Sequence, residues 1–161
     1  MALTAPQLTA LKAAIAADPV LLAQPNNSDG DYAIASAFNL PASPAFTVWK
    51  TYVPSTQVGD NMVGTEVAGL TTANISRLQL IIQMSEAGVN PSLIDRRQFF
   101  DDVFSGAGGV LTRAKLLILW KRLATRAEKL FATGTGTDPS PATLVFEGQL
   151  SYQDVGMARA S

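Results

Sequence analysis

The chain has 161 residues, of which 47% are hydrophobic and 16% charged, and its formal net charge is −1. This length suits one ordinary domain with a core that needs no disulfides, and the low charged share, against about 25% in typical proteins, indicates apolar surface that partners cover in an assembly. Cys and His are both absent, which excludes disulfides, thiolate nucleophiles, Cys-ligated zinc and imidazole acid–base catalysis.

The first half of the chain has signals for short helices separated by loops. Thr4 and Gln7 have the spacing of a capping box, which predicts that a helix begins at residue 5. Ser43 followed by Pro44 has the pattern of an N-cap before the first residue of a helix. With the apolar spacing, these signals predict helices over residues 5–17, 19–23, 31–39 and 45–52, a loop over 24–30, and a frayed helix or ordered loop over 55–69.

The second half has longer stretches of helical apolar periodicity. These stretches predict helices over residues 72–87, 91–105 and 112–132. Gly88 has the position of a left-handed residue that ends the first of them. A second capping box, Thr125 and Glu128, lies inside the last one. We therefore expect a kink or a restart near residue 124.

The character of the sequence changes after residue 133. Residues 134–141 are rich in Gly, Thr and Pro, as linkers are. The β-branched and aromatic residues of 143–147 predict a short strand, which must pair with another part of this chain or with another subunit. Residues 151–154 either cap a last short helix or continue as an extended tail.

The predicted architecture is therefore mainly α. We expect a small helical bundle of about six to eight helices over residues 1–133, and a linker with a C-terminal extended arm containing a short β-strand over 134–161. The densest apolar run, residues 116–120, is far too short to span a bilayer, and the start of the chain lacks the pattern of a signal peptide. These features predict synthesis in the cytosol and no membrane partner.

Three patterns that resemble chemical sites are better explained by structure. The acidic triplet at 29–31 lacks the later Glu of a calcium loop. Asp101 and Asp102 are adjacent and would point about 100° apart on a helix, so they form no acid–base dyad. The glycine-rich segments 106–109 and 134–136 lack the lysine of a phosphate loop. We predict no metal site, no cofactor and no catalytic residue.

Basic residues are concentrated late in the chain. Six of them, against one acid, lie between Arg113 and Lys129. This stretch suits an acidic subunit or DNA in a channel, although a solvated helix face is the common explanation and the net charge argues against free nucleic-acid binding. The candidate interaction residues of this stretch and of the predicted arm are Thr143, Leu144, Val145, Phe146, Tyr152, Arg113, Lys121, Arg122 and Arg126.

Four segments, at residues 46–54, 77–80, 124–136 and 142–148, resemble a family of tailed-phage and prophage proteins encoded among virion structural genes. The resemblance implies a non-enzymatic head-to-tail adaptor or connector subunit that forms a homo-oligomeric ring through its helical body and C-terminal arm. It implies a virion location after synthesis in the host cytoplasm, contacts with portal, tail or nozzle subunits, and passive contact with packaged DNA. It supplies no functional residues.

Other functions remain open at this point. A tail-tube, tail-completion or capsid-decorating protein fits the composition nearly as well. A soluble helical regulatory or DNA-associated module would rely on residues 113–129. A lysozyme-like hydrolase would need an acidic side chain in a cleft, and the glutamates available are Glu66, Glu86, Glu128 and Glu147.

Overall fold

The computed structural model describes residues 3–85 and 88–161. The chain folds into two compact units: unit 1 consists of Met1–Val48 with Leu123–Ser161, and unit 2 of Trp49–Arg122. Unit 2 is thus one continuous segment inserted between the two segments of unit 1. The fold is mainly α, as the sequence predicts. The division of the chain does not fall at residue 134, because the segment beyond it belongs to unit 1.

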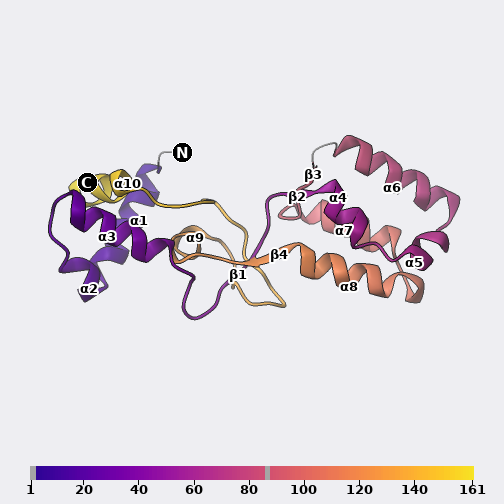
Figure 1. Ribbon diagram of the computed structural model, residues 1–161, viewed down its shortest axis with the longest axis horizontal. Coiled ribbons are helices and arrows are strands. Elements are labelled where there is room, and N and C mark those ends of the chain that lie inside the picture. The colour runs from indigo at the N-terminus through magenta and orange to yellow at the C-terminus, as the bar shows by residue number, and fades with distance from the viewer. Residues whose placement is uncertain (1–2, 86–87) are drawn as a thin grey trace. The chain divides into compact units, whose positions relative to one another are not determined.

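Unit 1 is helical. Its helices among the described residues are α1 (Ala5–Ala16), α2 (Pro19–Leu22), α3 (Ser28–Asn39), α9 (Arg126–Phe131) and α10 (Tyr152–Ala160) (Figure 1). Capping boxes begin α1, α9 and α10, which confirms the predicted restart before α9 and the helical alternative for the chain's end. Helix α3 begins earlier than predicted because the side chain of Asn27 accepts a hydrogen bond from the Gly30 N–H at 3.0 Å and caps it.

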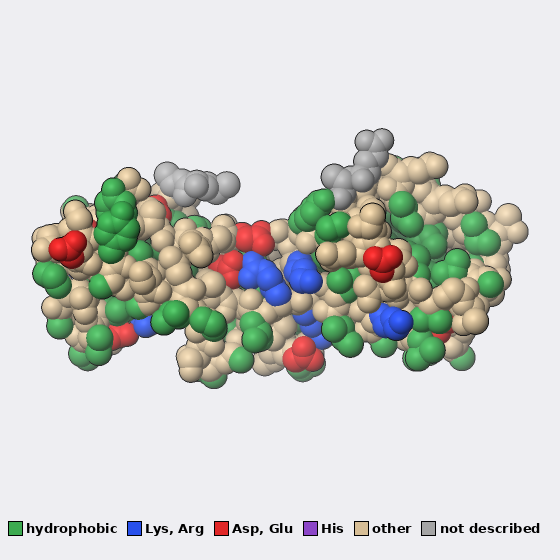
Figure 2. Space-filling view, viewed as in Figure 1, with side chains coloured by type: hydrophobic (Ala, Val, Ile, Leu, Met, Phe, Trp, Pro, Cys, Tyr) green, Lys and Arg blue, Asp and Glu red, His purple; other side chains and the backbone are tan. Residues whose placement is uncertain are grey.

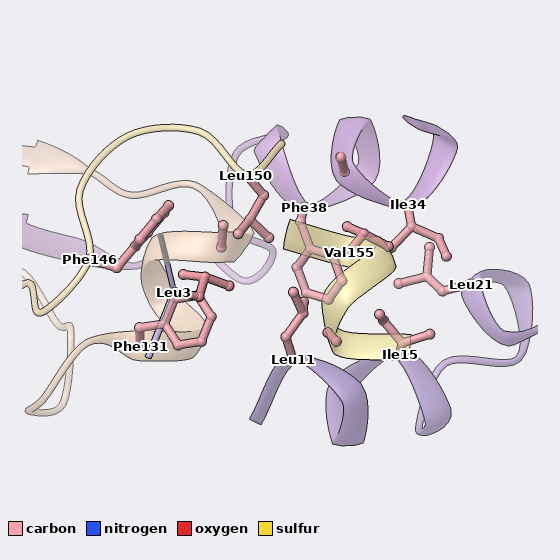
Figure 3. Close-up of a cluster of buried hydrophobic side chains, with 13 residues drawn as sticks. Leu3, Leu11, Ile15, Leu21, Ile34, Phe38, Phe131, Phe146, Leu150 and Val155 are labelled. Atoms are coloured by element: carbon pink, nitrogen blue, oxygen red, sulfur yellow. The ribbon is translucent and has the colours of Figure 1, made fainter. Parts of the chain in front are cut away.

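The core of unit 1 joins the two ends of the chain. Figure 3 shows Leu11 of α1, Phe38 of α3 and Val155 of α10 pointing toward one another, and all three side chains are buried. Phe146, ahead of α10, packs edge-on against Phe131 of α9, with ring centroids 5.4 Å apart. The predicted C-terminal arm is therefore wrong: its apolar residues are part of the unit 1 core.

The predicted strand over 143–147 is also wrong. Among the described residues this segment makes only isolated bridges, Thr133 with Thr143 and, just before it, Val48 with Ala142. The backbone of this segment thus forms bridges inside unit 1 at only one or two positions, which is too little pairing for a strand. Phe146 is drawn into the core instead of continuing a ladder.

A short sheet replaces two of the predicted helical stretches. Strand β1 (Thr47–Trp49) pairs with β4 (Lys121–Leu123), where helices over 45–52 and through residue 124 are expected. Hydrogen bonds from the Lys50 N–H to the Trp120 carbonyl, 2.8 Å, and from the Ala124 N–H to the Phe46 carbonyl, 2.9 Å, flank the pair. The chain passes between the two units through these strands. Pairing with a segment more than 70 residues away overrides the local helix signals.

Unit 2 holds the remaining elements. They are β2 (Val53–Pro54), α4 (Ser55–Asp60), α5 (Gly64–Ala68), α6 (Thr72–Met84), β3 (Gly88–Val89), α7 (Ile94–Val103), the 3-10 turn η1 (Ala107–Gly109) and α8 (Val110–Leu119). Helix α6 ends at Met84, before the predicted end at residue 87, and residues 86 and 87 lie outside the described residues. Gly88 does not terminate a helix; it begins β3, which is antiparallel to β2. Helix α7 begins at Ile94, later than predicted.

The core of unit 2 is separate from that of unit 1. Phe100 of α7 lies at its centre, 5.4 Å from the ring of Trp120 and fully buried. Leu78 and Ile81 of α6 and Leu116 of α8 pack into the same cluster. Helices α4, α6, α7 and α8 and the β2–β3 pair thus contribute buried residues to this core. Because one face of α8 packs on the core, its opposite face points outward.

Candidate interaction site

Helix α8 is apolar on two opposite faces. Thr112 and Leu116 point into the unit 2 core and are fully buried. The residues on the opposite side occupy a sector of about 120° on a helical wheel, and are exposed: Val110, Leu111, Ala114, Leu117 and Ile118. An apolar face of a helix is normally buried. The exposed sector therefore has the composition of a contact surface.

The outer residues of this sector are strongly exposed. The exposed fraction is 76% for Ile118 and 59% for Leu111. The charged residues of α8 are Arg113 and Lys115, and the helix has no acidic residue. Figure 2 shows hydrophobic side chains at the surface of the part of the chain that contains α6 and α8, with few charged groups among them. Exposed clusters of this kind mark interaction sites.

Glu66 fixes the beginning of α8. Its carboxylate accepts hydrogen bonds from the N–H groups of Leu111, 3.0 Å, and Thr112, 2.7 Å, which start the helix. Burial works against the charge of Glu66, but the hydrogen bonds from Thr112 and Leu111 outweigh it and hold the pKa of Glu66 below its ordinary value. Thr112 in turn accepts a hydrogen bond from the Val63 N–H at 3.0 Å. The segment at α5 therefore positions α8.

A pocket opens beside the exposed face of α8. Its volume is about 310 Å³. Its lining consists of Trp49, Arg97, Asp101, Arg113, Ala114, Leu117 and Trp120. Ala114 and Leu117 belong both to the pocket and to the exposed sector, so the pocket and the apolar face form one continuous surface within unit 2.

The backbone of unit 2 holds the two arginines of the pocket in place. The guanidinium of Arg97 lies 4.0 Å from the centroid of the Trp49 ring and donates a hydrogen bond to the Pro91 carbonyl. That of Arg113 donates to the carbonyls of Phe104 and, at 3.1 Å, Gly106. Each guanidinium has five N–H donors. Donors therefore remain for a group that enters the pocket.

The backbone at Gly109 ties the end of α7 to the start of α8. A side chain at this position would collide with the backbone of Phe104. Glycine alone permits this close approach. The same Phe104 carbonyl accepts from Arg113, so the turn between α7 and α8 also sets the position of one of the pocket's cations.

The pocket carries more positive than negative charge. Two guanidinium groups, of Arg97 and Arg113, face one carboxylate, Asp101. Burial raises the pKa of Asp101 above its ordinary value although Arg113 and Arg97 favour its charged form, and burial lowers the pKa of Arg97. Partial desolvation of Arg97 strengthens its attraction for an anion compared with that of a fully hydrated guanidinium.

Trp120, one of the residues that line the pocket, has a buried hydrogen-bond donor. The residue is 2% exposed, and the described residues offer its Nε1–H no hydrogen-bond partner. A buried donor without an acceptor costs about 1–3 kcal/mol. Unsatisfied groups of this kind are uncommon in native structures and call for an explanation.

The predicted basic stretch does not form one surface. Its residues are spread over α8, β4 and α9, in both units. Arg113 lies in the pocket, and Lys121 and Arg122 lie in β4, where both have interactions of their own. Arg126 pairs with Asp18 at 2.8 Å. Of the predicted interaction residues, the structure therefore brings Arg113 alone to the pocket.

The interaction residues predicted in the arm lie in unit 1. Thr143 exchanges backbone hydrogen bonds with Thr133, and Leu144 packs on the small cluster around Val48. Phe146 is buried in the core of unit 1, and the ring of Tyr152 stacks on Tyr32 with centroids 4.3 Å apart. Val145 is 62% exposed. Most of these residues therefore hold unit 1 together.

Sequence reasoning missed the aromatic part of the site. Trp49 and Trp120 are far apart in the chain, and their meeting depends on the pairing of β1 with β4. A signal was present for Arg97 and Asp101, which are four residues apart and share a face of α7. The neighbouring cation Arg113 comes from α8, which no local pattern connects to α7.

Comparison with known proteins identifies no relative: no protein-family model, no curated protein and no solved structure matches the chain. Within residues 3–85 and 88–161, no three His, Cys, Asp or Glu side chains are grouped as metal ligands would be. No helix in the same ranges has the length and apolar character needed to cross a membrane.

Proposed function

We propose that this chain is a non-enzymatic subunit of a tailed-phage virion, most specifically a head-to-tail adaptor. The observation that carries an assembly role is the exposed apolar face of α8, on a helix whose opposite face is already buried. This face consists of Val110, Leu111, Ala114, Leu117 and Ile118. The virion location rests on the four segments that resemble phage structural proteins.

The exposure of the α8 face suits a protein interface. Four of its large apolar side chains are exposed by 44% to 76%. Covering such side chains removes apolar surface from water, which contributes about 25 cal/mol per Å², before the entropy cost of association.

The proposal places the contact on the helical body and not on the C-terminal arm. Leu150, Val155 and Ala158 lie in the unit 1 core, so a truncation that removes them would damage folding as well as assembly. The role of the glutamates also supports a structural function. Glu66 and Glu128 both accept hydrogen bonds from backbone N–H groups, whereas Glu86 lies outside the described residues.

The test compares two charged double variants. Leu111→Glu with Ile118→Glu places two carboxylates on the α8 face without touching the core. The matched control is Val20→Glu with Leu22→Glu, on two α2 residues that are 70% and 60% exposed. Light scattering measures the mass of each protein alone and mixed with purified portal and tail proteins. We expect the wild type and the control to form a defined complex with these proteins, and the α8 variant to remain unbound with unchanged helicity.

Assembly of the α8 variant at wild-type level would contradict the proposed contact. A wild-type chain that ignores every virion protein offered would contradict the virion role and favour the regulatory alternative.

A further inference from the structure

Resting on the proposed function, we propose that the pocket beside α8 receives the carboxylate of an acidic residue on a partner protein, while apolar side chains around that residue cover the exposed face of α8. The two parts of the contact are continuous, because Ala114 and Leu117 line the pocket and also belong to the exposed face.

Charge selects the anion. The pocket holds the guanidinium groups of Arg97 and Arg113 and the single carboxylate of Asp101, so one more carboxylate balances it. Both guanidinium groups are oriented before a partner arrives, through the carbonyls of Pro91 and Gly106. Charge-assisted hydrogen bonds from arginine to carboxylate are the strong class of such bonds, and preorientation reduces the entropy lost on binding.

The aromatic ring of Trp49 supports the same occupant. This ring, already stacked against Arg97 at 4.0 Å, offers a flat apolar wall for the carbon chain that carries the carboxylate. An acidic side chain with apolar neighbours matches both this wall and the guanidinium groups of the pocket.

Two other occupants fit less well. A second copy placed α8 against α8 would bring Arg113 and Lys115 of both chains together, and α8 has no acidic residue to offset them. A DNA backbone would supply anions, but it would leave the exposed apolar face of α8 uncovered. A protein surface that combines apolar and acidic side chains would place a carboxylate in the pocket and also cover the exposed face of α8.

The chain contains its own reporter for this pocket. It has two tryptophans, and both line the pocket. Titration of the full-length protein with benzoate, a carboxylate on a flat apolar ring, should therefore change tryptophan fluorescence saturably. Benzamide has the same shape without the charge and should bind at least about tenfold more weakly, because it forms no charge-assisted bond.

Three variants separate the pocket from general effects. Arg97→Gln should weaken benzoate binding about tenfold or more. Asp101→Asn removes the competing carboxylate and should tighten binding about three- to tenfold; a loss of folding cannot imitate this gain. Arg77→Gln is the control, because Arg77 contacts the Phe99 ring at 5.4 Å and is outside the lining of the pocket.

Equal binding of benzoate and benzamide, or no gain with Asp101→Asn, would overturn the inference. Displacement of benzoate by a short DNA duplex would overturn it too and assign the pocket to phosphate. If benzoate fails while the charged α8 variant still blocks assembly, the pocket inference falls and the proposed function stands. If benzoate binds as expected while that variant assembles normally, the anion site stands and the proposed contact falls.

Discussion

At the scale of single residues, Glu128 joins two distant segments of unit 1. Its side chain is 2% exposed and accepts hydrogen bonds from the N–H groups of Thr125, 3.0 Å, and Gly148, 3.3 Å. A buried carboxylate is tolerated only when hydrogen bonds replace its lost water. The same side chain therefore starts α9 and fastens the segment that leads to α10.

Glu128→Ala should lower the free energy of unfolding by about 2–3 kcal/mol, because it removes a helix cap and leaves two N–H groups without their acceptor. Urea unfolding followed by circular dichroism measures the change. Asp60→Ala, at an exposed position at the end of α4, is the comparison and should stay within about 0.5 kcal/mol of the wild type. Equal effects would mean that the capping hydrogen bonds contribute little.

Asp18 makes the stability of unit 1 dependent on pH. The hydrogen bond from Arg126 is the largest cause that lowers the pKa of Asp18 below its ordinary value of 3.8; burial opposes it, and the N–H groups of Leu21 and Val20 add to it. Since the folded-state pKa lies below that of the unfolded chain, this stabilisation is present above pH 3.8 and is lost as the pH falls through the folded-state pKa.

Asp18→Asn keeps an oxygen that can cap α2 but has no charge for Arg126. We therefore expect the variant to be less stable than the wild type at pH 7 and the difference to shrink as the pH falls below 3.8. Thermal melts at a series of pH values measure it. A difference that stays constant down to pH 2 would show that the charge of Asp18 is not involved.

At the scale of elements, α8 combines two functions on opposite faces. Leu116 is fully buried, and the next residue, Leu117, is 44% exposed. Leu116→Ala should lower the free energy of unfolding by about 2–5 kcal/mol, because it opens a cavity in the unit 2 core. Leu117→Ala should change stability by less than about 1 kcal/mol, and chemical denaturation of the two variants checks the contrast. Similar losses would show that α8 does not have a free face.

Local signals account for the helices and fail at the sheet. The capping boxes at Thr4 and Thr125 mark true helix starts, because their donors and acceptors are only three residues apart. Ser43-Pro44 carries an equally good local signal, yet Val48 is fully buried in a strand paired with β4. The pairing that makes this segment a strand involves residues far along the chain, so a prediction from a short stretch of sequence does not detect it.

At the candidate site, too, the sequence indicates local features but not which segments come together. The excess of basic residues drew attention to Arg113, which does lie in the pocket. The predicted arm was the opposite case, since the aromatic and β-branched character of residues 143–147 is explained by burial of Phe146 against Phe131. Apolar character predicts that a segment is covered, but the sequence does not say whether its own chain or a partner covers it.

At the scale of the whole molecule, each unit has a core of its own. The cluster around Leu11, Phe38 and Val155 draws on unit 1 alone, and the cluster around Phe100 and Leu116 on unit 2 alone. Separate cores are what independent folding requires. The insertion of unit 2 through the paired strands β1 and β4 leaves the two cut ends of unit 1 adjacent.

Two fragments test this independence. Residues 49–122 alone should give a helical spectrum and a cooperative thermal transition, and residues 1–48 joined to 123–161 by a short Gly-Ser linker should do the same. Circular dichroism melts of both, beside the intact chain, measure this. A gradual, non-cooperative melt of either fragment would show that its core depends on the other unit.

The insertion also sets an order of events during synthesis. A ribosome that has released residues 49–122 has released all of unit 2, whereas α1, α2 and α3 still lack α9 and α10. Because domains fold as units during translation, we expect unit 2 to fold first, while Leu11, Ile34 and Phe38 stay uncovered until α10 has emerged. Helices α1 to α3 are therefore the part of this chain that we expect to stay exposed longest during synthesis.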